Sequence, residues 1–373
     1  MPPFGNPTGA FNLTYDLAEL GWTPALAAGF AALGATGLIP ARVAAQHRDR
    51  FVLFTEAGEL DASPSGNLRH QAAPGDFPAV GDWVAARPSP GMSLIEQVLA
   101  RRGAFTRTAA DPTRPDAAAR QVVVAANADL VLIVTAAHLD LNFRRLERFL
   151  AAAWESKAEP VVVLTKIDLV PDAERLLGLI AQVAPGVRAI GVDNLSGVGV
   201  AQVRALIGPG LTAAFLGTSG VGKSTLINRL LGEDRQAVSG VRADGRGRHT
   251  TTGRELILLP GGGLVLDTPG MRLLAPASDA GLEAAFADIE TLAIHCRFGD
   301  CRHEREPGCA VLAAVEAGVL AADRLAGFHK LRRELQHLDR REDPVARSEQ
   351  QKKWRSIHKG AREHIKRKRE GWD

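Results

Sequence analysis

The sequence predicts a multidomain fold with three folded parts: an N-terminal β-barrel of the oligonucleotide-binding (OB) type, an α/β phosphate-loop domain, and a C-terminal helical domain built around cysteines. Three observations predict this fold. Short strand-like runs separated by Gly and Pro occupy residues 41–105. Apolar runs rich in Val and Leu alternate with helical stretches over 106–277. All three Cys fall within 278–345.

Residues 1–40 form an N-terminal extension with one expected helix, from Thr23 to Leu33. Pro24 stands near its start and Gly34 follows its end, as helix termini favour. The expected barrel strands are Ala41–Ala44, Phe51–Thr55, Asp82–Ala86 and Leu94–Val98. The pattern does not distinguish a barrel that binds nucleic acid from one that binds nothing.

The central segment predicts a parallel sheet, because nearly continuous Val, Leu and Ile runs suit strands that are buried on both faces. The expected strands are Val122–Ala126, Leu130–Ala136, Val161–Thr165, Ala213–Gly217 and Leu264–Asp267. Helical stretches between these runs indicate the crossovers that a parallel sheet requires.

Residues 217–224 fit the phosphate-loop pattern G-x-x-x-x-G-K-[ST]. Glycines let the backbone N–H groups of such a loop converge on phosphate, at the start of a helix. Lys223 is expected to reach the β- and γ-phosphates as a catalytic residue, and Ser224 to ligate Mg²⁺. The expected nucleotide-binding residues of this loop are Gly217, Thr218, Ser219, Gly220, Val221, Gly222, Lys223, Ser224 and Thr225.

A second phosphate-side motif is Asp267-Thr268-Pro269-Gly270, which follows an apolar strand. Asp267 is expected to hold Mg²⁺ and the Gly270 N–H to face the γ-phosphate. The polar segment ahead of it offers Thr251 as a second Mg²⁺ ligand and His249 as the catalytic group that positions water. His249 is the local candidate because Met271 stands where many GTPases have Gln. The alternatives are a flexible surface loop and a histidine that contacts RNA phosphate.

Thr165-Lys166-Ile167-Asp168 is expected to recognise guanine. The carboxylate of Asp168 can accept from N1–H and the exocyclic amine of guanine, a donor pair that adenine lacks. Lys166 can lie over the base, while Thr165 replaces the usual Asn. Residues 191–197 stand where a loop contacting guanine O6 would fall, with Asp193-Asn194 in place of the usual Ser-Ala pair. That contact usually uses backbone N–H groups.

The order of these motifs is unusual. The guanine motif at 165–168 stands ahead of the phosphate loop at 217–224, whereas an ordinary GTPase has it last. This order predicts a circularly permuted GTPase domain.

Cys296, Cys301, His303 and Cys309 form a candidate metal site. Three thiolates and one imidazole make a closed tetrahedral zinc site, which indicates a structural role. An iron–sulfur or redox centre is the alternative, although no C-x-x-C pair is present. His295 is an alternative ligand.

The net charge of +3 is unevenly distributed. From Lys330 to Asp373 there are 15 Lys and Arg against 8 Asp and Glu, so residues 346–373 are expected to form a basic helical tail. A polyanionic partner or a solvated helical face would explain it. No membrane span or export signal is evident, and three Cys do not make a disulfide framework, so a cytoplasmic protein is expected.

Together, the order of the nucleotide motifs and the Cys/His cluster resemble the RsgA or YjeQ family of small-ribosomal-subunit biogenesis GTPases. Further similarity lies in 37–43, 79–84 and 330–335. The resemblance implies GTP hydrolysis stimulated by the small ribosomal subunit, binding of its rRNA, action in its late maturation, and a monomer with no membrane partner. It also implies a hydrolytic role for His249.

Three other functions remain open on the residues alone. The chain could be a P-loop ATPase in which 165–168 is accidental, a non-catalytic RNA-binding module, or an RNA-binding P-loop NTPase with a non-ribosomal target.

Overall fold

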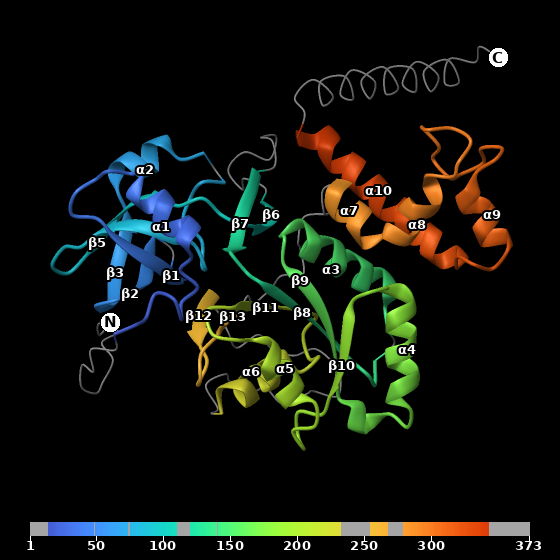
Figure 1. Cartoon of the computed structure of the whole chain (residues 1–373), viewed down its shortest axis with the longest axis horizontal. Coiled ribbons are helices and arrows are strands. Elements are labelled where there is room, and N and C mark those ends of the chain that lie inside the picture. The colour runs from blue at the N-terminus through green and yellow to red at the C-terminus, as the bar shows by residue number, and fades with distance from the viewer. Residues whose placement is uncertain are drawn as a thin grey trace, which may run out of the picture.

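The computed structural model describes residues 14–47, 49–73, 75–109, 120–139, 141–232, 254–267 and 279–342. Figure 1 shows three parts: a small barrel, a central α/β layer structure, and a helical C-terminal part beside it. The predicted fold class is confirmed by this architecture.

The helix expected near the N-terminus is present as α1 (Pro24–Ala31). Thr23 caps it, since its hydroxyl accepts from the Leu26 N–H at 3.3 Å. Trp22, just before the cap, packs edge-on against Trp83 of the barrel with ring centroids 4.7 Å apart. The N-terminal segment is therefore held on the barrel by aromatic packing.

The barrel closes through five strands. They are β1 (Ile39–His47), β2 (Arg50–Thr55), β3 (Gly58–Pro64), β4 (Trp83–Arg87) and β5 (Ser93–Val98), with α2 (Gly66–Gln71) between β3 and β4. The order β1-β2-β3-β5-β4 returns to β1, and only the β3–β5 pair is parallel. Such a closed barrel is of the OB type. Strand β3 was not expected, because Gly58 and Pro64 were interpreted as turn signals.

The central sheet has the order β10-β9-β8-β11-β13-β12. All neighbours are parallel except β12 and β13. The strands are β8 (Leu130–Ala136), β9 (Glu159–Thr165), β10 (Arg188–Val192), β11 (Thr212–Leu216), β12 (Arg254–Leu258) and β13 (Leu264–Asp267). Strands β10 and β12 were not expected from the sequence.

Helices cover both faces of this sheet (Figure 1). They are α3 (Phe143–Glu155), α4 (Ala173–Val183), α5 (Val200–Leu206) and α6 (Lys223–Leu231), with the short 3₁₀ turn η1 (Ile167–Leu169) after β9. Along β8, Val131 packs in one apolar cluster with residues of α3 and α4, and Leu132 packs in the other with residues of α5 and α6. This alternation explains the nearly continuous apolar strands.

One expected strand pairs differently from the prediction. The run Val122–Ala126 belongs to β7 (Arg120–Ala126), which forms a separate antiparallel ribbon with β6 (Ala104–Ala109) rather than a strand of the parallel sheet. A short apolar run indicates a strand but does not identify its partner. The Ala126 N–H also donates to the Val80 carbonyl, so the ribbon lies against the barrel.

The barrel and the central sheet are continuous, because β1 pairs with β12 at Ala45 and Glu255. Arg42 on β1 reinforces this junction from a fully buried position. Its guanidinium donates to the Leu20 carbonyl and, at 2.8 Å, to the Thr212 hydroxyl at the start of β11. Burial lowers the pKa of Arg42 to about 10.

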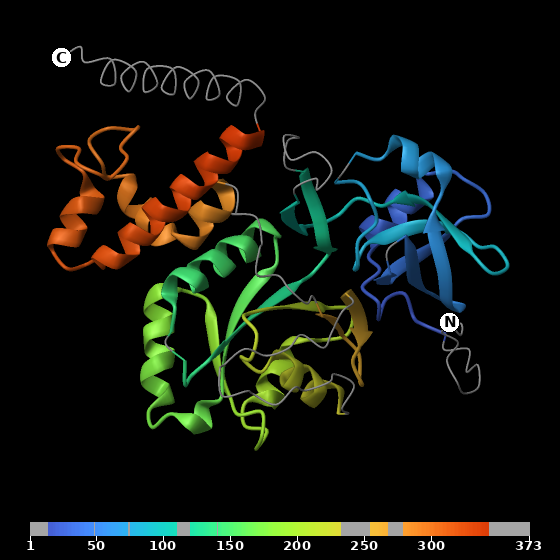
Figure 2. The ribbon, with the colours of Figure 1, turned by 180° about the vertical axis from the view of Figure 1, so that it is seen from behind.

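The C-terminal part consists of α7 (Asp279–Ala285), α8 (Ala287–Ala293), α9 (Ala310–Glu316) and α10 (Ala322–Glu342). Phe286 and Phe328 meet edge-on at 5.5 Å in its core. Figure 2 shows α10 running alongside α3 of the central part. Within the described residues, no helix is long and apolar enough to cross a membrane.

Candidate nucleotide site and metal centre

The phosphate loop lies where the sequence predicts it, between β11 and α6. Gly217, Gly220 and Gly222 have φ values of +150°, +80° and +94°, a region that favours glycine. A side chain at Gly217 would also meet the Val134 carbonyl of β8. The Lys223 ammonium donates to the carbonyls of Gly217 at 2.8 Å and Thr218 at 2.7 Å, so the loop curls around it.

The carboxyl ends of β8, β9, β11 and β13 meet at one edge of the sheet. This edge gathers the predicted motifs, because Thr165 ends β9, Asp267 ends β13 and the phosphate loop follows β11. Lys166 has φ +57°, which turns the chain sharply into η1 and leaves Asp168 exposed. Ligands of open α/β sheets bind at this edge.

Thr165 connects the guanine motif to the phosphate loop. Its side chain is fully buried, its hydroxyl donates to the Val221 carbonyl, and the same oxygen lies 3.1 Å from the Thr135 carbonyl. Residues 56 positions apart in the sequence are thus in contact at the predicted site.

The loop after β10 is shaped by Asp193. Its carboxylate accepts from the N–H groups of Leu195 at 2.8 Å and Ser196 at 3.2 Å and from the Ser196 hydroxyl. These hydrogen bonds, that of the hydroxyl foremost, lower the pKa of Asp193. Arg229 on α6 binds the loop backbone, donating to the carbonyls of Asn194 at 2.7 Å and Leu195 at 2.6 Å.

Two of the predicted Mg²⁺ ligands lie in the described part of the chain. Asp267 is buried at the carboxyl end of β13, and Ser224 is half-buried in the first turn of α6. A carboxylate and a hydroxyl at one edge are suitable oxygen donors for Mg²⁺. The other predicted residues of this region, His249, Thr251 and Gly270, lie outside the described residues.

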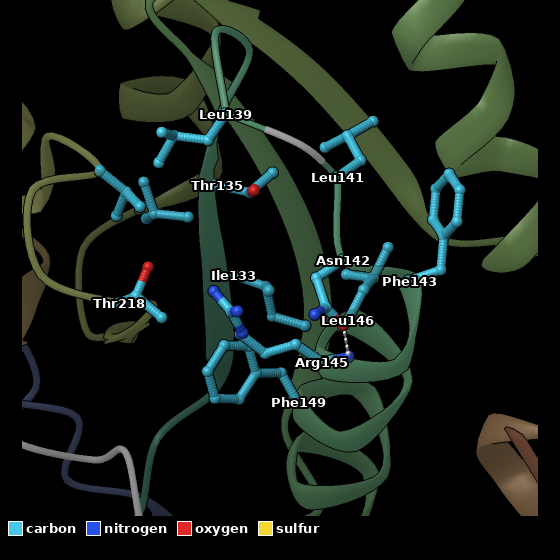
Figure 3. A pocket seen from close by; sticks show the side chains of 12 residues that line it. Ile133, Thr135, Leu139, Leu141, Asn142, Phe143, Arg145, Leu146, Phe149 and Thr218 are labelled. Carbon is cyan, nitrogen blue, oxygen red and sulfur yellow. Dashed lines mark hydrogen bonds between the residues drawn. The ribbon is translucent and has the colours of Figure 1, made fainter. Parts of the chain in front are cut away.

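A cavity of about 40 Å³ lies beside the phosphate loop (Figure 3). Thr218 lines one side, and Ile133 of β8 and Leu146 of α3 line others. Asn142 caps α3 here, accepting from the Arg145 N–H at 2.9 Å. Most of the lining is apolar, so the cavity does not itself resemble a phosphate site.

The four predicted metal ligands come together. The donor atoms of Cys296, Cys301, His303 and Cys309 all lie within 4.8 Å of one another. Cys296 Sγ is 3.8 Å from Cys309 Sγ, and His303 Nδ1 is 3.6 Å and 3.4 Å from these two sulfurs. A tetrahedral ion with metal–sulfur bonds of about 2.3 Å and a metal–nitrogen bond of about 2.0 Å requires spacings of about 3.5–3.8 Å. The cluster can therefore hold a metal ion.

The chain around this cluster is tightly ordered by hydrogen bonds. His303 takes φ +60° and is buried, while its carbonyl lies 3.1 Å from His329 Nε2 on α10. The Glu306 carboxylate accepts from backbone N–H groups of Arg305 and Glu304, and these bonds, in that order, lower the pKa of Glu306 to about 2. These hydrogen bonds hold the loop that carries the ligands in the conformation seen here.

Sequence reasoning missed two contacts at the nucleotide site. It did not anticipate the Arg229 bonds, because nothing in the sequence pairs a helix residue with a loop 34 positions earlier. It noted Asn194 only as a departure from the usual pair, and the side-chain contact of Asn194 with the phosphate loop emerged from the structure.

Comparison with known proteins agrees with this geometry. Residues 98–276 match the family model described as RsgA GTPase. A protein of Opitutus terrae named small ribosomal subunit biogenesis GTPase RsgA is 44% identical over 365 residues, covering 94% of this chain and 98% of the relative. A protein of the same name from Streptomyces coelicolor is 42% identical over 345 residues, covering 91% and 92%.

Solved structures show the same fold. The structure of YjeQ from Thermotoga maritima has a TM-score of 0.60 and 26% identity, covering 80% of this chain and 98% of that one. A structure of YloQ, described as a circularly permuted GTPase, has a TM-score of 0.59 and 22% identity, covering 81% and 96%. Together with the relatives, these similarities place the motif order in a known permuted fold, and the chain belongs to the RsgA GTPase family.

Proposed function

We propose that the protein hydrolyses GTP and acts in the maturation of the small ribosomal subunit, as the names of its relatives state for them. One structural observation carries the nucleotide part: the Thr165 hydroxyl contacts the Val221 carbonyl, so the guanine motif and the phosphate loop share one site.

Within that site, the phosphate loop cradles the phosphates with backbone N–H groups, and Lys223 neutralises developing charge on the β- and γ-oxygens. The ammonium now bound by Gly217 and Thr218 carbonyls exchanges these partners for phosphate oxygens. Asp168 reads the guanine edge from its exposed position after β9. Thr165 and Lys166 position the base.

Two metal ions complete the proposal. Mg²⁺ binds with GTP, held by Ser224 and Asp267, and Thr251 is the predicted further ligand. It supplies charge neutralisation at the phosphates. Zn²⁺ is the ion proposed for the Cys/His cluster, because three thiolates and one imidazole are a donor set that suits zinc. With four protein ligands, that ion stabilises the fold and leaves no position for catalysis.

His249 is the proposed group that orients the attacking water, and Gly270 the proposed γ-phosphate contact. Both lie outside the described residues, so these roles rest on the sequence. Met271 has no group that can orient water, and slow turnover in the absence of the subunit is therefore expected.

The partner is proposed to be the small subunit and its rRNA. The OB-type barrel is a fold that commonly binds oligonucleotides. The basic segment 346–373 adds positive charge, although it lies outside the described residues. A cytoplasmic monomer is proposed, and the domain limits stated above stay a prediction.

The test is phosphate release from GTP and from ATP, with and without purified small ribosomal subunits. We expect GTP-selective hydrolysis that the subunits stimulate strongly. ATP preference would refute the guanine assignment, and GTP hydrolysis without stimulation would refute the ribosomal one.

A further inference from the structure

Asn194 makes a side-chain contact that the family pattern does not require. Its Nδ2 donates to the Gly222 carbonyl at 3.2 Å, joining the loop after β10 to the phosphate loop. The side chain is buried, with 6% of the residue exposed. Asn194 therefore acts on the phosphate loop through its carboxamide, and not only through its backbone.

Thr165 approaches the same glycine from β9. A Cβ placed on Gly222 would lie 3.0 Å from Asn194 Nδ2 and 3.6 Å from Thr165 Oγ1. The two side chains thus face one α-carbon, one from the end of β9 and the other from the loop after β10. Gly222, at φ +94°, leaves the space that both of them use.

The two positions are also the two departures from the usual sequence pattern. The usual pattern has Asn at position 165 and Ala at position 194, whereas this chain has Thr and Asn. The carboxamide that the usual pattern has in the guanine motif therefore stands here in the loop after β10. The structure shows that the end of β9 and the loop after β10 both reach the phosphate loop, so a side chain at either position can hydrogen-bond to it.

The other end of the Asn194 carboxamide is also informative. Its Oδ1 is buried and has no hydrogen-bond partner among the residues that the structure describes. Buried acceptors are rarely left unpaired, so this atom indicates a donor that the described chain does not supply. Because the phosphate loop is adjacent, the donor is expected to arrive when nucleotide binds.

The loop is held so that Asn194 faces this way. Asp193 fixes the turn that follows, and Arg229 holds the Asn194 carbonyl at 2.7 Å. Arg229 belongs to α6, the helix into which the phosphate loop runs directly. The loop after β10 is therefore joined to the phosphate loop at one end of α6 and to the body of the helix further along.

We infer that Asn194 is a positioning residue for guanine nucleotide, whose carboxamide holds the loop after β10 against the phosphate loop at Gly222. The inference rests on the proposed function. It makes Thr165 and Asn194 a matched pair, because a larger carboxamide at 165 would enter the space beside Gly222 that Asn194 occupies.

The test uses the full chain with four variants, N194A, N194D, T165N and the double variant T165N/N194A. GDP dissociation constants and rates are measured with a fluorescent GDP, and kcat and KM for GTP by phosphate release. N194A and N194D should each weaken GDP binding by about three- to tenfold, since each loses the donor to Gly222. T165N should also bind more weakly, whereas the double variant should recover to within about threefold of the natural chain.

Thermal unfolding separates a tether from a merely structural role. Without nucleotide, N194A should unfold at nearly the same midpoint temperature as the natural chain. Added GDP should raise that midpoint less for N194A than for the natural chain. The control is Gln202→Ala, which removes an exposed carboxamide from nearby α5 and should leave GDP binding unchanged. N194D retains the shape of the side chain and serves if N194A does not fold.

Additive losses in the double variant, or unchanged GDP binding in both N194A and N194D, would overturn the inference. If the natural chain itself binds no guanine nucleotide, the proposed function fails and the inference fails with it. That outcome is distinct from a natural chain that binds GDP and whose Asn194 variants bind it equally well.

Discussion

Arg324 and Glu147 form a buried ion pair between α10 and α3, 177 positions apart in the sequence. Arg324 Nη1 lies 3.1 Å from Glu147 Oε1, and the two side chains are only 5% and 6% exposed. Arg324 also binds Asp288 at 2.8 Å and lies over the Phe286 ring at 4.1 Å. A side chain at Gly327 would collide with the Glu147 carboxylate. The C-terminal helices are thus locked onto the nucleotide-binding part by charge and by shape.

Replacing Arg324 by Met should destabilise this junction. The change leaves Glu147 and Asp288 without their common partner, and breaking a buried pair in this way costs about 3–5 kcal/mol. Denaturant unfolding of the metal-loaded chain measures the loss. Arg144→Met is the matched control, because the Arg144–Asp323 pair joins the same helices at 3.9 Å but is exposed, and should cost about 0–1 kcal/mol. Equal losses of unfolding free energy in the two variants would mean that the buried pair contributes no more stability than the exposed one.

Glu147 also predicts a pH dependence. Burial raises the pKa of Glu147 above its ordinary 4.5, against the opposing effect of Arg324. The folded state therefore holds the proton more tightly than the unfolded state, and the stabilisation is full below pH 4.5 and lost as pH rises through the raised pKa. The stability advantage of the natural chain over E147Q should accordingly shrink from pH 5 to pH 8 in urea titrations. An advantage that grows instead would show that Arg324 outweighs burial.

Lys223→Ala should abolish GTP hydrolysis, with a loss of at least about 100-fold in kcat, because no other cation of the phosphate loop can neutralise the β- and γ-oxygens. Phosphate release measures it. Lys330→Ala, an exposed lysine of α10, controls for loss of charge and should retain basal turnover. Retained hydrolysis in the Lys223 variant would remove its catalytic assignment.

Asp168→Asn should exchange base specificity. Asparagine offers an amide donor where guanine needs an acceptor, whereas xanthine carries a carbonyl in place of the exocyclic amine and fits that donor. GTP affinity should fall by about 100-fold or more while XTP becomes a substrate, as competition binding would show. The control is Asp61→Asn, the same substitution at an exposed position of the barrel, which should leave GTP selectivity unchanged. Unaltered GTP selectivity would place the guanine-reading group elsewhere.

Removing the proposed zinc should unfold the ligand loop and the helices that flank it. Elemental analysis should find about one Zn²⁺ per chain, and Cys301→Ser should lower both zinc content and the melting temperature. Glu304→Gln, an exposed change within the same loop, should affect neither. A full complement of metal in the Cys301 variant would exclude Cys301 as a ligand.

Some features of this protein follow from the sequence alone. The phosphate loop and the Cys/His cluster are short segments whose residue types and spacing already specify the chemistry, and they lie where they were expected. The N-terminus of α1 is likewise local, because Thr23 caps it by accepting from the N–H of Leu26, only three residues further along the chain. The order of the nucleotide motifs was enough to predict the permuted fold.

Other features depended on the tertiary structure. The run Val122–Ala126 pairs with β6 and not with the parallel sheet, β1 joins β12 across the barrel boundary, and Asn194 meets Gly222. Each of these depends on which distant segments come together. Periodicity and spacing in the sequence indicate only which face of an element is buried and which chemical groups its residues carry. Which distant segment an element pairs with is decided when the whole core packs.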